Sequence, residues 1–99
     1  MKSIMVTEKG QCFLCGRTCQ TEKHHIYQGS GRRRLCDKYG LTVYLCHNCH
    51  NEPPNGVHHN AERDLALKAQ AQYRAMYVHG WTEEQFRKIF RKSYIREDL

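Results

Sequence analysis

Apolar residues fall into short clusters along the first half of the chain, separated by polar and glycine-rich stretches. Residues 24–27 (His-His-Ile-Tyr) are typical of the end of a strand, and residues 41–45 (Leu-Thr-Val-Tyr-Leu) consist largely of β-forming residues. Between them lies Gly-Ser-Gly at residues 29–31, followed by three arginines. Glycine and serine favour turns, so we expect a loop here that also carries the arginines.

The second half of the chain has a helical pattern that begins at Asn60. Four apolar residues recur at helical spacing: Leu65, Ala69, Tyr73 and Met76. Gly80 suits the end of this helix. Residues 82–85 (Thr-Glu-Glu-Gln) fit a capping box that opens a second helix. We expect its apolar side to carry Phe86, Ile89, Phe90 and Tyr94, and its basic side Arg87, Lys88, Arg91, Lys92 and Arg96.

These elements predict one α+β domain over residues 1–99, with a core of about residues 10–60 and a helical extension of about residues 61–99. A domain of 99 residues buries little surface and often needs a metal or a partner for stability. No apolar segment follows the first methionine, and no run is long enough to span a membrane. We therefore expect a cytoplasmic protein whose six cysteines bind metal and do not form disulfides.

Two Cys-x-x-Cys pairs are the strongest chemical signal in the sequence. Cys12 pairs with Cys15, and Cys46 pairs with Cys49. Each pair places two thiolates at one turn, and two such turns complete a tetrahedral site for a structural Zn²⁺. Free thiols or a redox pair are the alternative interpretation. Cys19 and Cys36 lack a partner at this spacing and are expected to be small packed side chains.

The formal charge of +6 favours a polyanionic partner. Zinc bound by four thiolates would still leave a charge of about +4. The three arginines, Arg32, Arg33 and Arg34, are candidates for phosphate contacts, because guanidinium groups pair with phosphate oxygens. The basic side of the last helix is a second candidate. Since many small basic proteins bind no nucleic acid, charge alone leaves both alternatives open.

The histidines add a second motif around the cysteine pairs. The string His24-His25-Ile26, a strand, and then Leu45-Cys46-x-x-Cys49-His50 resembles the zinc-knuckle HNH endonucleases. A wider similarity, over residues 24–34, 39–46 and 49–58, is to phage HNH nucleases related to the RecA-dependent nuclease group. The resemblance implies a zinc-stapled ββα-metal fold that hydrolyses DNA phosphodiesters in a bacterial host cell. DNA, and a RecA-type recombinase filament, are the partners that it implies.

The same resemblance assigns the catalytic roles. His25 would be the general base, and His24 and His50 would bind one catalytic divalent metal, which is Mg²⁺, Mn²⁺, Ni²⁺ or Zn²⁺. The third ligand would be His58 or His59, and His58 is favoured because it lies within the wider similarity. A neutral imidazole can take a proton from water near neutral pH.

One position departs from the family pattern. Leu41 stands where the family has its middle asparagine, which fixes the catalytic loop by hydrogen bonds. Backbone groups could hold the loop instead. Two alternatives to a nuclease therefore stay open. One is a non-catalytic zinc-containing module that binds nucleic acid, and the other is an adaptor that docks on a recombinase through C-terminal aromatic residues, Trp81, Phe86, Phe90 and Tyr94.

Overall fold

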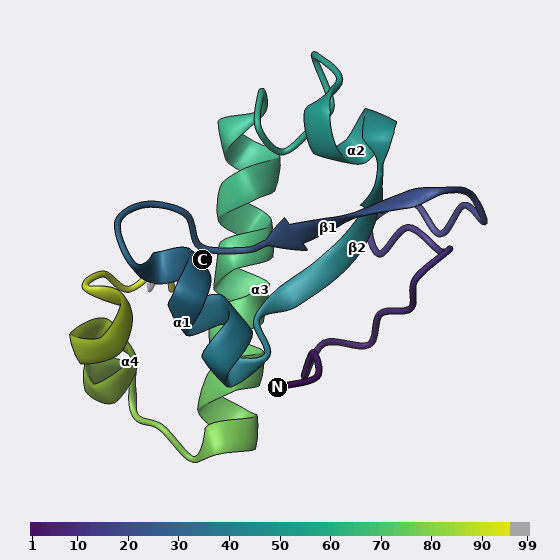
Figure 1. Cartoon of the computed structure of the whole chain (residues 1–99). Coiled ribbons are helices and arrows are strands. Elements are labelled where there is room, and N and C mark those ends of the chain that lie inside the picture. The colour runs from purple at the N-terminus through teal and green to yellow at the C-terminus, as the bar shows by residue number, and fades with distance from the viewer. Residues whose placement is uncertain (96–99) are drawn as a thin grey trace.

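The computed structural model describes residues 1–95, and within that range it is a small α+β fold with one two-stranded sheet and four helices. Strands β1 (Thr21–His25) and β2 (Thr42–Cys46) are antiparallel, and His24 lies opposite Val43. Helix α1 (Arg32–Tyr39) connects them (Figure 1). The chain continues through α2 (His47–Asn51), α3 (Ala61–His79) and α4 (Glu83–Phe90). The strand predicted over residues 41–45 is confirmed with a shift of one residue, and the strand predicted to end within residues 24–27 ends at His25.

The three arginines lie in a helix, so the loop expected over residues 32–34 is wrong. Gly31 adopts a left-handed conformation with φ 77°, and α1 begins at the next residue. The next eight residues contain neither glycine nor proline, which would interrupt a helix. The side chain of Cys36 is buried on the inner side of this helix. Gly40, with φ 75°, ends α1 by donating its N–H to the Cys36 carbonyl. The loop therefore stops at the glycines themselves.

Helix α3 begins and ends where the sequence predicts, but it buries a different face. The Asn60 side chain accepts the Arg63 N–H, and Gly80 ends the helix in a left-handed conformation. Tyr73, expected on the inner face, is 56% exposed. The buried residues of this helix are two alanines and two larger residues: Ala71, Ala75, Leu67 and Gln72. Leu65, Ala69 and Met76 are only partly buried at its margin.

Helix α4 closes an aromatic core. Its predicted capping box is present, since Thr82 and Gln85 bond each other's backbone N–H. Phe86 and Phe90 stack at 4.8 Å and both contact Tyr27, which follows β1. Phe86 and Phe90 are therefore core residues.

The last helix ends earlier than the basic pattern suggests. Arg91 has φ 72°, so α4 ends at Phe90. Tyr94 reaches the core from beyond the helix, where its N–H donates to the buried Gln72 side chain at 2.6 Å. The predicted basic side is consequently split between α4 and the segment after it, and Arg96 lies outside the described residues.

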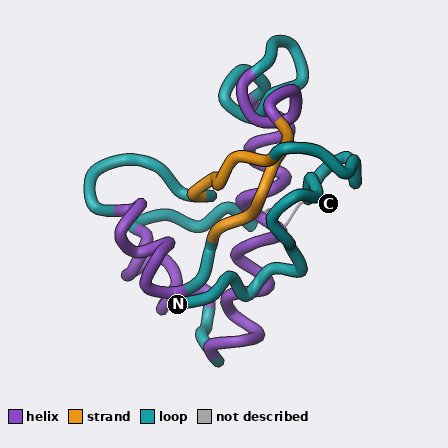
Figure 2. Tube along the Cα trace, turned by 45° about the vertical axis from the view of Figure 1, so that its right-hand side comes forward, coloured by secondary structure: helices purple, strands orange, loops and turns teal. Residues whose placement is uncertain are grey.

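The N-terminal segment runs along the outer edge of β2, as the tube in Figure 2 shows. The Ile4 N–H donates to the Gly40 carbonyl at 2.8 Å, and the Tyr44 N–H donates to Thr7 Oγ1 at 3.0 Å. This edge of the sheet is thus covered. Across residues 1–95, none of the helices combines the length and apolar character needed to cross a membrane.

Candidate metal centres

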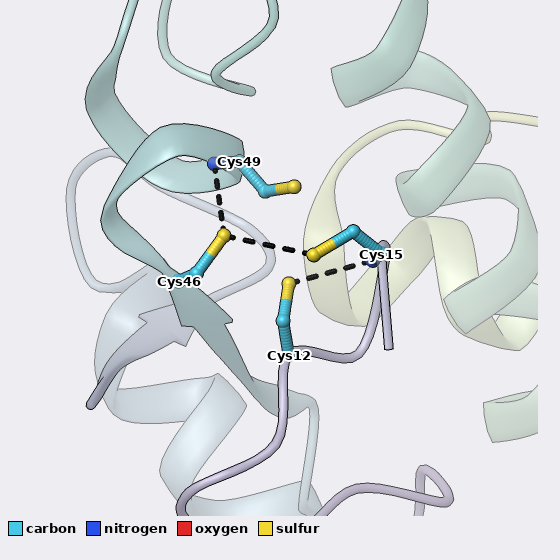
Figure 3. Close-up of side chains that lie close together, drawn as sticks. All are labelled: Cys12, Cys15, Cys46 and Cys49. Atoms are coloured by element: carbon cyan, nitrogen blue, oxygen red, sulfur yellow. Dashed lines mark hydrogen bonds between the residues drawn. The ribbon is translucent and has the colours of Figure 1, made fainter. Parts of the chain in front are cut away.

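The four paired cysteines converge on one point, as Figure 3 shows. The Sγ atoms of Cys12, Cys15, Cys46 and Cys49 all lie within 4.8 Å of one another. The Cys15 and Cys46 sulfurs are 3.8 Å apart. Four sulfurs at about 2.3 Å from one tetrahedral Zn²⁺ would lie about 3.8 Å apart, so this donor set fits a structural zinc.

Both cysteine pairs use the same local geometry. The Cys15 N–H points to Cys12 Sγ at 3.5 Å, and the Cys49 N–H points to Cys46 Sγ at 3.4 Å. The first pair is tied to the sheet because the Phe13 N–H donates to the Tyr44 carbonyl at 2.8 Å. The second pair spans the junction of β2 and α2. The site therefore joins the N-terminal turn to the end of the hairpin.

The cysteines of the cluster differ in pKa, since burial raises the pKa of Cys49 whereas that of Cys12 is lowered. Burial raises the pKa of Cys12, but hydrogen bonds from backbone amides outweigh it and bring the pKa to about 6. The Arg63 guanidinium of α3 lies 3.9 Å from Cys49 Sγ and offsets negative charge on the thiolates. Helix α3 thereby contacts the zinc site directly.

The other two cysteines lie outside this cluster. Cys36 is fully buried, where it accepts the Tyr27 N–H, and burial raises the pKa of its thiol to about 11. Cys19 is partly buried and its Sγ lies 3.7 Å from the Arg17 carbonyl. Both occupy packed positions, as expected.

Three histidines form a second cluster. One ring nitrogen from each of His24, His50 and His58 lies within 4.8 Å of the others, and the Nε2 atoms of His50 and His58 are 3.0 Å apart. His24 Nε2 is buried and has no hydrogen-bond partner among the described residues. Burial, together with the neighbouring histidines, lowers the pKa of His24 to about 3. A neutral imidazole with a free buried nitrogen is a ready metal ligand.

A close backbone approach brings His58 to the cluster. Gly56 packs against the end of α2, where a Cβ atom would lie 2.9 Å from the Asn51 nitrogen. The chain then bonds back to α2, since the Val57 N–H donates to the Cys49 carbonyl and the His58 N–H to the His50 carbonyl. His59 is exposed and takes no part in the cluster. Of the two candidates for third ligand, the geometry selects His58.

Glu22 supports the cluster from β1 and was missed in the sequence. Its carboxylate lies 2.8 Å from His50 Nδ1, and this hydrogen bond lowers the Glu22 pKa. Such a contact fixes the ring and leaves Nε2 to point at a metal. Alternation along the strand is the signal that would have found it, because Glu22 and His24 share one face. His47, between the knuckle cysteines, is exposed and also contacts Glu22.

His25 is the last residue of β1, and its side chain lies against α1. Its Nε2 atom lies 2.9 Å from Asp37 Oδ1 on α1, and this hydrogen bond lowers the Asp37 pKa. Backbone and side-chain hydrogen bonds hold the loop that follows. The Leu41 carbonyl accepts the Ile26 N–H at 3.1 Å, and Gln28 Nε2 donates to the His25 carbonyl at 2.6 Å.

Only one of the three predicted arginines lines the space around these histidines. A hollow of about 350 Å³ is lined by the three clustered histidines, His25, Gln28, Lys23 and Arg33. Arg32 is directed to the Gln28 carbonyl and the Tyr94 hydroxyl, each at 3.5 Å. Arg34 is exposed elsewhere on α1.

Comparison of the chain with protein-family models, with curated proteins and with solved structures gives no match. The chemistry of the two clusters must therefore be argued from their own geometry. Four thiols form a complete donor set for zinc, whereas three imidazoles fit a divalent cation and leave part of its coordination to water or substrate.

Proposed function

We propose that this protein is a metal-dependent endonuclease of the HNH type that hydrolyses DNA phosphodiester bonds. The observation that carries the proposal is the hollow in which His25 lies beside three convergent imidazoles. Its described lining includes Lys23 and Arg33 but no carboxylate. The basic side chains suit the negative charge of a phosphodiester. A general base is needed because the proton must be taken from the attacking water.

His25 would act as the general base. With Nε2 donating to the Asp37 carboxylate, a neutral imidazole keeps its lone pair on Nδ1. That nitrogen can take a proton from water as the oxygen attacks phosphorus and the scissile P–O bond breaks. Asp37 would then stabilise the imidazolium, and Gln28 keeps the His25 backbone in place.

His24, His50 and His58 would hold the catalytic cation, with Glu22 orienting His50. When bound, a divalent cation stabilises negative charge on the phosphate and on the leaving oxygen. Lys23 and Arg33 would bind the neighbouring phosphate oxygens. These contacts carry no base readout, so weak sequence preference is expected.

A zinc-containing module that binds nucleic acid without cutting it is the second candidate. Leu41 in place of the usual asparagine favours it. The backbone contacts of Leu41 and Gln28 favour the enzyme, since they hold the same loop. A recombinase filament stays a proposed partner, which the experiment below includes.

A plasmid-nicking assay tests the proposal. Wild-type protein is incubated with Mg²⁺, Mn²⁺, Ni²⁺ or Zn²⁺, each with and without a RecA-type filament. His25→Ala should lower cleavage about 10²–10⁴-fold and excess metal should not restore it, because the proton acceptor is lost. His59→Ala is the matched control and should cut like wild type. If His25→Ala cuts at the wild-type rate, His25 is not the base. If wild-type protein binds DNA but cuts under none of these conditions, the binding module is correct.

A further inference from the structure

The sheet face that carries His25 continues into a second basic hollow. Lys23 and His25 are two residues apart on β1 and therefore share one face of the strand. Across the sheet they lie opposite Tyr44 and Thr42. Thr42, Tyr44 and Lys23 also line a hollow of about 450 Å³ between this face and the N-terminal segment. Lys23 lines both hollows, which makes them neighbours.

The second hollow is strongly basic. Lys2 and Lys9 line it together with Lys23, and Glu8 is the one carboxylate among its described lining residues. Within residues 1–95, neither Lys2 nor Lys9 forms an ion pair, and both are exposed. Two ammonium groups without carboxylate partners are available to an anion.

The N-terminal segment that carries these lysines is fixed to the sheet. The Ser3 hydroxyl donates to the Thr42 carbonyl at 2.5 Å, and the Ile4 N–H donates to Gly40. Arg74 of α3 donates to the Ile4 carbonyl at 2.9 Å, which anchors the segment from its other side. The hollow therefore exists before any ligand binds, so little ordering entropy would be lost on binding.

We infer that the DNA backbone runs from the histidine hollow across Lys23 into this second hollow, where Lys2 and Lys9 bind its phosphates. The inference rests on the proposed function and names the path of its substrate. Continuity through Lys23 and the excess of lysines over carboxylates carry it. Lysine suits phosphates as a point charge that does not read sequence.

The basic residues of α4 are the rival path, but they are placed less well. Helix α4 follows the end of α3, whereas α2 lies beside the start of α3 (Figure 1). Arg87 lies 3.5 Å from Glu83 and Lys92 lies over the Tyr94 ring, while Lys23 lies 3.6 Å from Asp37, so position and not pairing distinguishes the two paths. The basic residues of α4 therefore lie toward the other end of α3 from α2.

Two matched double variants decide between these paths. Lys2→Ala with Lys9→Ala removes two charges from the second hollow, and Lys88→Ala with Lys92→Ala removes two from the region of α4. Both are made in a His25→Ala background, so that the DNA stays intact. Binding to a 20-bp duplex is measured by fluorescence anisotropy over a series of salt concentrations. Zinc content and circular dichroism check that each variant is folded.

The expected result is a salt dependence that weakens only for the first pair. Each lost phosphate contact lowers the slope of log affinity against log salt by about 0.9, so the Lys2/Lys9 variant should lose about 1.8. The Lys88/Lys92 variant should keep the parent slope. An unchanged slope for Lys2/Lys9 overturns the path alone. If the parent protein does not bind the duplex at low salt, the path and the proposed function both fail.

Discussion

The cysteine cluster and the histidine cluster share α2, where Cys49 and His50 are neighbours, yet their donor sets differ. Four thiols fill a tetrahedron, and three of the four residues are buried. Three imidazoles leave coordination positions open, and they line a hollow. A closed set suits a structural ion, whereas an open set leaves room for a substrate oxygen. The cysteine cluster therefore suits a metal that stabilises the fold, whereas the histidine cluster suits a metal that would act on a bound substrate.

The two clusters also depend on each other unequally. The cysteine cluster joins the N-terminal turn to β2 and α2, so it fixes the helix that carries His50. The histidine cluster adds a loop residue, His58, to elements that are already in place. Loss of the first should therefore disrupt the second, while loss of the second should leave the first intact.

The largest expected effect is loss of the fold on removal of zinc. A strong chelator, or Cys46→Ser, should abolish the cooperative unfolding transition, because structural zinc contributes about 10–16 kcal/mol of binding free energy in small domains. Circular dichroism and metal analysis measure this. Cys19→Ser is the control and should retain one zinc per chain. Protein purified without chelator that carries no zinc would contradict the assignment.

Features set by neighbouring residues could be predicted from the sequence. The cysteine pairs, the caps of α3 at Asn60 and Gly80, and the capping box at Thr82 all depend on residues a few positions apart. Their physical causes, which are hydrogen bonds within one turn, are visible in the sequence itself. The resemblance to HNH endonucleases suggested His24 and His50 together with either His58 or His59, and the structure brings His24, His50 and His58 together.

Features that depend on packing between distant segments could not be predicted from the sequence. The buried face of α3 is chosen by what packs against it, which left Tyr73 outside. Asp37 reaches His25 only because the segment after Gly31 is a helix packed beside β1. Because residues 32–34 were predicted to be a loop, the contact between Asp37 and His25 could not be predicted. Glu22 was missed for a different reason, since its strand was recognised only near its end.

A smaller effect should follow removal of one imidazole. His58→Ala should lower affinity for the catalytic metal by at least about 100-fold, since even changes behind a ligand cost about 10–100-fold. Excess metal should partly restore cleavage. Isothermal titration of zinc-loaded protein with Mn²⁺ measures the affinity, and one structural zinc per chain shows that the fold survives. His59→Ala should bind like wild type. Equal losses for the two variants would remove His58 from the ligand set.

The smallest effect concerns the carboxylate behind His50. Glu22→Gln should lower Mn²⁺ affinity by about 10–100-fold, because the amide holds the ring less firmly and does not increase its basicity. Glu52→Gln is the matched control. Glu52 contacts His47 at 2.9 Å, as Glu22 does at 3.2 Å, but only Glu22 also reaches His50 Nδ1. Titration with Mn²⁺ should therefore separate the two variants while both retain one structural zinc. If Glu52→Gln weakens binding as much as Glu22→Gln does, the effect arises from net charge. The contact with His50 would then have no specific part in holding the metal.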